Sequence, residues 1–183
     1  MNRSLGGAIL LLSPFRQSPV LDGVIPMKPA HGRQQAADSL RLFTIGYEGR
    51  TLRSFADRLK DEQVRVVIDV RELPLSRKKG FSKTALAEAL GQEGIDYLSL
   101  RALGAPRAVR HRLREDRDYA AFFAAYSEHM RRQADAIEEL NSLLSEVTVC
   151  LMCYEADPRH CHRSAIASEL EHQHGLELEV KHL

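Results

Sequence analysis

The chain has no tryptophan and only three cysteines, Cys150, Cys153 and Cys161. Three cysteines cannot all be paired within one chain, and their close spacing is more typical of a protein from a reducing compartment than of a disulfide-rich secreted domain. Neither sign of charge dominates, because 26 Lys and Arg residues stand against 25 Asp and Glu residues. The overall charge therefore gives no reason to expect nucleic acid or a membrane as the partner.

Long apolar runs are also missing from the N-terminal region. Residues 5–12 are apolar, but the run is far shorter than the roughly 20 residues that span a bilayer, and no small-residue cleavage site follows closely. The first forty residues show no sustained periodicity and include four prolines. We predict that residues 1–40 are a poorly ordered extension, and that the protein is cytoplasmic and makes no contact with a membrane.

The common cofactor motifs are absent as well. The sequence contains no P-loop, no Rossmann glycine fingerprint and no GxSxG motif. Cys153, Cys161 and His162 have the spacing C-x7-C-H without a second pair of ligands, which is unlike a structural zinc site, and no CxxC redox pair occurs. No metal and no cofactor are predicted.

What the sequence does contain is an alternation of strand and helix patterns from residue 42 onward. Apolar runs predict strands at 42–46, 64–70, 95–98, 147–153 and 176–180. Helical spacing predicts helices at 51–62, from Ser82 to Gly94, at 119–144 with a break near Met130, and from about Cys161 to Gly175, while 99–117 is expected to be irregular. This order predicts an α/β fold, in which 41–183 form a single three-layer domain with a mostly parallel sheet and helices on both faces.

Ligands bind at the carboxyl ends of the strands in such a sheet, so polar residues there are candidates for a site. Asp69 ends an apolar strand, and a buried carboxylate there needs a partner such as Arg71 or Arg163. A structural ion pair and a functional site are equally good interpretations. We predict catalytic roles for Asp69, Glu155 and Cys161, and substrate-binding roles for Tyr47, Arg71, Ser76, Arg77, Lys83 and Arg163.

Cys161 lies near the predicted start of a helix and beside Arg163. Both features favour a thiolate, so we expect a lowered pKa and a nucleophilic thiol. His162 shares one helical stripe with Ile166 and Leu170 and is expected to pack against the sheet. Cys150 points away from Cys153 along the strand and is expected to be a small core residue.

A second basic feature is the segment 101–117, which resembles a solvated loop but could also follow a phosphate backbone. No aromatic residue lies between its arginines, so base stacking is not indicated. The segment contains six arginines, Arg101, Arg107, Arg110, Arg112, Arg114 and Arg117.

Five stretches follow one another from Phe43 onward, 44–49, 69–77, 80–83, 103–107 and 153–163. In these stretches and in their order the chain resembles the domain of unknown function 488 family of bacterial and archaeal proteins. It implies a compact α/β fold but no defined activity. The stretches span three strand ends and one helix start, and such polar positions favour a binding or catalytic role.

The hypothesis that best fits these residues is an enzyme or binding protein for a phosphate-bearing or nucleotide-like substrate. Two alternatives remain open. One is a nucleic-acid-binding module that uses 101–117, and the other is a metal or redox sensor built on the cysteines. Convergence of Asp69, Arg71, Glu155 and Arg163 on one cleft would favour the first hypothesis.

The predicted extension leads to a first test. A protein that begins near Arg41 should melt within a few degrees of the full chain, because the first patterned strand starts there. Thermal unfolding followed by circular dichroism would check this. A large fall in melting temperature would show that the removed residues pack on the domain.

Overall fold

Five strands form one sheet within residues 40–183, the part of the chain that the computed structural model describes. They are β1 (Leu40–Gly46), β2 (Val66–Asp69), β3 (Asp96–Ser99), β4 (Val149–Cys153) and β5 (Leu178–His182). Their order is β3-β2-β4-β1-β5, and every neighbouring pair is parallel. The predicted α/β fold is confirmed, with a sheet that is parallel throughout.

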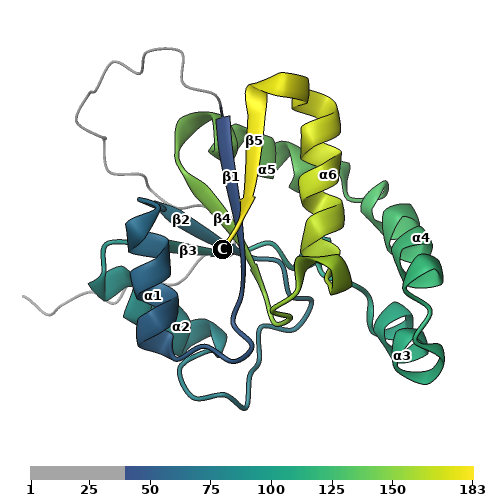
Figure 1. The fold of residues 1–183 in the computed structure, drawn as a ribbon, viewed down its shortest axis with the longest axis horizontal. Coiled ribbons are helices and arrows are strands. Elements are labelled where there is room, and N and C mark those ends of the chain that lie inside the picture. The colour runs from purple at the N-terminus through teal and green to yellow at the C-terminus, as the bar shows by residue number, and fades with distance from the viewer. Residues whose placement is uncertain (1–39) are drawn as a thin grey trace, which may run out of the picture. The chain divides into compact units, whose positions relative to one another are not determined.

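Helices cover both faces of this sheet (Figure 1). On one face lie α1 (Leu52–Asp61) and α2 (Lys83–Gln92), and on the other lie α4 (Tyr119–Met130), α5 (Ala134–Glu146) and α6 (His162–His174). Successive residues of a strand point to opposite faces, so each strand supplies two separate cores. The predicted three-layer arrangement is therefore confirmed.

Strand β4 shows this division clearly. Cys150 and Met152 pack in the core under α1 and α2, together with Phe55 and Leu86. Leu151 packs in the other core, which contains the buried side chains of α4, α5 and α6. All five residues of β4 are buried, as expected for a strand in the middle of a parallel sheet.

Several predicted helix boundaries are also confirmed. Thr51 caps α1 at the predicted start of this helix, and its hydroxyl accepts a hydrogen bond from the Ser54 amide while the Ser54 hydroxyl accepts one from the Thr51 amide. The predicted break near Met130 separates α4 from α5. Gly175 caps the end of α6 with a positive φ of 60°.

The prediction for 99–117 was wrong. This segment contains a short 3-10 turn, Arg101–Leu103, and the helix α3 (Arg107–Asp116). No residue of α3 is buried, and its contact with the core comes from the partly buried Val109 and Leu113, four residues apart. Two apolar residues among so many charges give too weak a periodicity to predict a helix.

Leu40, at the end of the predicted extension, belongs to β1 and pairs with Leu178. The rest of that prediction, for residues 1–39, lies outside the described residues. No helix within 40–183 is both long and apolar enough to cross a membrane.

The strand order reverses between the neighbouring strands β1 and β4, because the chain continues from β1 toward one edge of the sheet and from β4 toward the other. The helix that follows β1, α1, packs on one face, and the helix that follows β4, α6, packs on the other. The segments that follow these two strands therefore lead to helices on opposite faces of the sheet (Figure 1). Such switch points are where parallel sheets of this kind bind ligands.

Gly46 allows the chain to pass this point. The amide of Tyr47 donates to the Cys153 carbonyl at 3.2 Å, and the amide of Glu48 donates to the Tyr154 carbonyl at 2.8 Å, so the pairing of β1 with β4 continues beyond the sheet. A Cβ at position 46 would overlap the backbone carbonyl of Glu155. Only glycine fits there without moving the loop.

Gly46→Ala should therefore destabilise the protein by about 1–3 kcal/mol, because backbone would have to move to make room. Gly91→Ala is the matched control, because a Cβ added at this position in helix α2 has no atom within 4 Å. Alanine there should stabilise the protein by up to about 1 kcal/mol. Urea unfolding of both variants would measure these changes. Equal stability of Gly46→Ala and the unmodified protein would show that the 155–156 loop yields freely.

Candidate functional site

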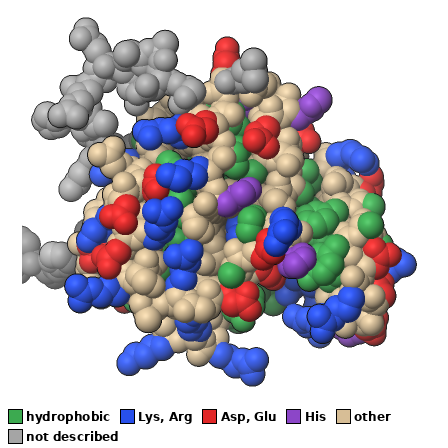
Figure 2. All heavy atoms as spheres, viewed as in Figure 1, with side chains coloured by type: hydrophobic (Ala, Val, Ile, Leu, Met, Phe, Trp, Pro, Cys, Tyr) green, Lys and Arg blue, Asp and Glu red, His purple; other side chains and the backbone are tan. Residues whose placement is uncertain are grey.

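A cavity of about 600 Å³ opens at the switch point. Most of its lining comes from four segments: 47–49 after β1, 71–78 after β2, one side of α3, and 153–162 from the end of β4 to the start of α6. Ala105, before α3, and Phe122 of α4 complete the lining. Lys and Arg side chains project along the lower edge in Figure 2, where the loop after β2 lies in Figure 1. The cavity is thus built from the strand ends that the sequence indicated.

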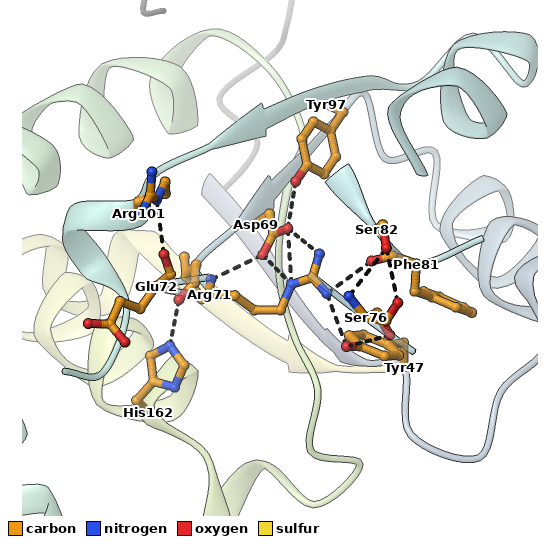
Figure 3. Close-up of polar contacts among 11 residues, drawn as sticks. Tyr47, Asp69, Arg71, Glu72, Ser76, Phe81, Ser82, Tyr97, Arg101 and His162 are labelled. Carbon is orange, nitrogen blue, oxygen red and sulfur yellow. Dashed lines mark hydrogen bonds and ion pairs between the residues drawn. The ribbon is translucent and has the colours of Figure 1, made fainter. Parts of the chain in front are cut away.

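Behind the cavity wall lies a buried ion pair between Asp69 and Arg71 (Figure 3). The Asp69 side chain is fully buried and that of Arg71 is 7% exposed. The guanidinium is bidentate: Nε donates to Oδ1 at 2.8 Å and a terminal nitrogen donates to Oδ2 at 2.5 Å. Tyr97 of β3 adds a hydrogen bond from its hydroxyl to Oδ2 at 2.5 Å. Asp69 is therefore fully paired.

The rest of the Arg71 guanidinium holds two other segments. Its second terminal nitrogen donates to the Tyr47 hydroxyl and to the Phe81 carbonyl, both at 3.0 Å. Burial alone would lower the pKa of Arg71, but the hydrogen bonds and charge of Asp69 outweigh burial and raise it. Burial and the charge of Asp69 raise the pKa of Tyr97 as well. Arg71 stays charged and fixed in place.

The loop from Arg71 to Phe81 is also held by aromatic and hydroxyl contacts. Tyr47 stacks on Phe81 with ring centres 4.5 Å apart. The Ser82 hydroxyl donates to the Ser76 carbonyl at 3.0 Å, so Ser82, the residue before α2, holds the loop closed and makes no side-chain cap hydrogen bond to the helix. Lys78 donates to the Tyr47 carbonyl at 2.8 Å. Several residues that the sequence suggested as ligands thus shape the wall.

At the base of the cavity lie Cys153, Glu155, Cys161 and His162. The Cys153 thiol donates to a Glu155 carboxylate oxygen at 3.1 Å. Burial would raise the pKa of Glu155, but hydrogen bonds from Cys153 and from its own amide outweigh burial and lower it. Glu155 is therefore an ionised carboxylate at neutral pH, which suits a general base better than a general acid.

The expected low pKa of Cys161 was wrong. Its side chain is 1% exposed, and burial, followed by the neighbouring Cys153 sulfur, raises its pKa well above the ordinary value. Burial also raises the pKa of Cys150, which lies in the other core as predicted. The role of Cys161 as nucleophile stays a prediction, and burial does not favour it.

Arg163 does not line the cavity. Its fully buried guanidinium donates to the carbonyls of Glu155 and Ala156, at 2.5 and 3.0 Å, and to the Thr44 hydroxyl at 3.3 Å. These contacts fasten the loop after β4 to β1. The geometry favours a structural role over the predicted contact with substrate.

The predicted site residues therefore divide into two groups. Those that line the cavity are Tyr47, Arg71, Ser76, Arg77, Glu155 and Cys161. Those that do not are Asp69, Lys83 and Arg163. Among the other lining residues, the predicted site did not include Arg110 and Arg114 of α3, Tyr154 or His162. The spacing of Arg110 and Arg114, four residues apart, would have revealed these two arginines had α3 been predicted as a helix.

The family comparison agrees with this geometry. A family model described as "Domain of unknown function DUF488" matches residues 51–170, which include the loop after β2, helix α3 and the loop after β4. The chain belongs to this family. The resemblance noted in the sequence is confirmed, although its first stretch, 44–49, lies before the matched range. No curated protein and no solved structure gives a significant match.

One DUF488 stretch outside the strand ends, 103–107, has a clear structural explanation. A Cβ at Gly104 would overlap the backbone of Glu72, so the turn before α3 packs directly on the loop after β2. The Tyr126 hydroxyl donates to the Leu103 carbonyl at 2.6 Å, and Arg110 forms an ion pair with Glu72. This stretch sets the distance between two walls of the cavity.

The buried pair of the DUF488 domain gives a stability prediction. Arg71→Ala should lower the free energy of unfolding by roughly 3–5 kcal/mol, because it leaves the Asp69 carboxylate buried without its partner. Arg110→Ala, which breaks the one-third exposed pair with Glu72, should cost less than about 1 kcal/mol.

Urea unfolding of the two variants would compare these costs directly. A loss at Arg71→Ala no larger than that at Arg110→Ala would mean that water reaches Asp69 and that the pair is not a structural requirement.

Proposed function

We propose that the protein is an enzyme that binds a phosphate-bearing small molecule of nucleotide size in this cavity. The volume, about 600 Å³, falls in the ordinary range for sites of small ligands. The main support is that two arginines, Arg77 and Arg114, line the cavity without any partner for their guanidinium groups within residues 40–183.

The charge of the lining favours an anion. Five lysines and arginines line the cavity against three glutamates. Arg71 is neutralised by Asp69 and Arg110 by Glu72, so these two are already paired. Arg77 comes from the loop after β2 and Arg114 from α3, so the two unpaired groups approach from different walls. Two guanidinium groups without protein partners can together bind the several oxygens of a phosphate.

The rest of the lining favours a ligand with an apolar or planar part. Within residues 40–183 the exposed large hydrophobic side chains are Leu73, Leu75 and Tyr154, and all three line this cavity. Tyr154 is 46% exposed and meets the Tyr47 ring edge to face. A nucleobase could lie against such a surface, whereas inorganic phosphate would leave it in water.

Glu155 is the group best suited to chemistry in this proposal. It lies at the base of the cavity, is partly exposed, and has a lowered pKa, so its carboxylate can accept a proton from water or from a substrate hydroxyl. Asp69 is fully paired and fully buried, which suits positioning of Arg71 rather than proton transfer.

The nucleic-acid alternative has less support from the same residues. In its basic segment, Arg110 and Arg114 line the cavity and Arg112 pairs with Asp116 along α3. Arg110 and Arg112, which this alternative requires for contacts with a phosphate backbone, are thus already paired with acidic residues of the domain. We therefore favour a small ligand.

Calorimetric titration with AMP, ADP and ATP would test binding. We expect at least one nucleotide to bind more tightly than inorganic pyrophosphate, because the apolar rim adds contact that pyrophosphate lacks. Arg77→Ala and Arg114→Ala should each weaken nucleotide binding about 10- to 100-fold, the usual loss for one charged hydrogen bond. Arg53→Ala is the control, since its side chain is 93% exposed on α1.

Two results would contradict the proposal. One is binding that is equally weak for every nucleotide and for pyrophosphate. The other is nucleotide binding that survives Arg77→Ala combined with Arg114→Ala, because the ligand would then lie elsewhere. Once a substrate is found, Glu155→Gln should abolish turnover and leave binding within a few fold.

A further inference from the structure

Three metal-ligating side chains meet at the base of the cavity. The sulfurs of Cys153 and Cys161 and the Nδ1 atom of His162 all lie within 4.8 Å of one another. Each sulfur is 3.8 Å from that same nitrogen. All three side chains are buried, and all three line the cavity. One nitrogen lone pair therefore faces two thiols at equal distance.

The orientation of His162 is fixed from behind. Its Nε2 lies 2.7 Å from the carbonyl oxygen of Val70 (Figure 3). A carbonyl only accepts hydrogen bonds, so Nε2 carries the proton and, in the neutral ring, the free lone pair is on Nδ1. Metal-binding histidines are held in this way, with the far ring nitrogen donating to a carbonyl or carboxylate.

The spacing of the three atoms is close to that of a tetrahedral metal site. With a Zn–S bond of about 2.3 Å and a Zn–N bond of about 2.0 Å, tetrahedral geometry separates sulfur from nitrogen by roughly 3.5 Å and the two sulfurs by roughly 3.8 Å. The observed sulfur–nitrogen separations of 3.8 Å are longer than this by about 0.3 Å. The two sulfurs lie within 4.8 Å of each other, so they would have to approach by up to about 1 Å to bind one ion.

We propose that Cys153, Cys161 and His162 bind one thiophilic divalent metal ion, with zinc as the first candidate. Two thiolates and an imidazole select zinc over magnesium or calcium, which prefer oxygen ligands. Three protein ligands would leave a fourth position, as in catalytic zinc sites, and all three ligands line the cavity.

The carboxylate of Glu155 lies beside this position, 3.1 Å from the Cys153 sulfur. It can accept a hydrogen bond from water or a ligand hydroxyl bound to the ion. Binding of the metal does not depend on the proposed function. Only the expectation that a phosphate oxygen takes the fourth position rests on it.

Titration of the full-length, chelator-stripped protein with Co²⁺ tests the site, because thiolate ligation gives an intense absorption band in the near ultraviolet. We expect one ion per chain, displaced by Zn²⁺. Cys153→Ser and Cys161→Ser should each weaken retention at least tenfold. Cys150→Ala is the matched control, because Cys150 lies on the same strand but packs in the opposite core, and it should keep the band.

The unmodified protein gives a second readout that needs no variant. Alkylation followed by mass spectrometry, with and without Zn²⁺, should show slower modification of Cys153 and Cys161 and an unchanged rate at Cys150. A folded, fully reduced protein that gives no Co²⁺ band, or Zn²⁺ protection that is absent or equal at all three cysteines, would overturn the inference.

These outcomes are separate from those of the proposed function. Nucleotide titration of the metal-free protein reports on the arginines alone. Nucleotide binding without a Co²⁺ band overturns the metal site and leaves the proposed function standing. A Co²⁺ band without nucleotide binding has the reverse meaning.

Discussion

The buried charge of Asp69 is the constraint on which the rest of the site depends. A carboxylate at the end of a buried strand is costly unless its hydrogen-bonding capacity is met, and here Arg71 and Tyr97 meet it. The guanidinium that neutralises Asp69 also binds Tyr47 and the carbonyl of Phe81. One ion pair thus connects β2 and β3 to the loops that follow β1 and β2, and so fixes one wall of the cavity.

Arginine has two distinct uses around this cavity. Arg71 and Arg163 are buried and donate their hydrogen bonds to groups of the protein itself, which fixes two loops against the strand ends. Arg77 and Arg114 are exposed to the cavity without partners in the described chain, which makes them the groups that can meet an anion. Rigid support behind and unpaired charge in front are what a preorganised anion site requires.

The two proposals place complementary chemistry in one space. The arginines would hold phosphate groups at the outer part of the cavity, and the sulfur and imidazole ligands would hold a Lewis acid at its base, beside the ionised Glu155. Burial raises the pKa of Cys161 in the metal-free protein, and a bound metal would reverse this by stabilising the thiolate. The same burial that disfavours Cys161 as a free nucleophile is compatible with a role as ligand.

The sequence by itself determined the strand and helix order, the parallel sheet and the polar strand ends, because apolar periodicity and capping residues such as Thr51 act locally. It did not reveal α3, whose only apolar contacts are Val109 and Leu113, or the unpaired state of Arg114. It could not tell whether the guanidinium groups of Arg71 and Arg163 are free for a ligand or already bonded within the protein, because the two arrangements give the same local sequence pattern. Only the tertiary structure decided this. Only the tertiary structure, too, shows that the start of α6 lies beside the end of β4 and so brings Cys161 and His162 next to Cys153, because sequence spacing does not contain the distances between ligand atoms.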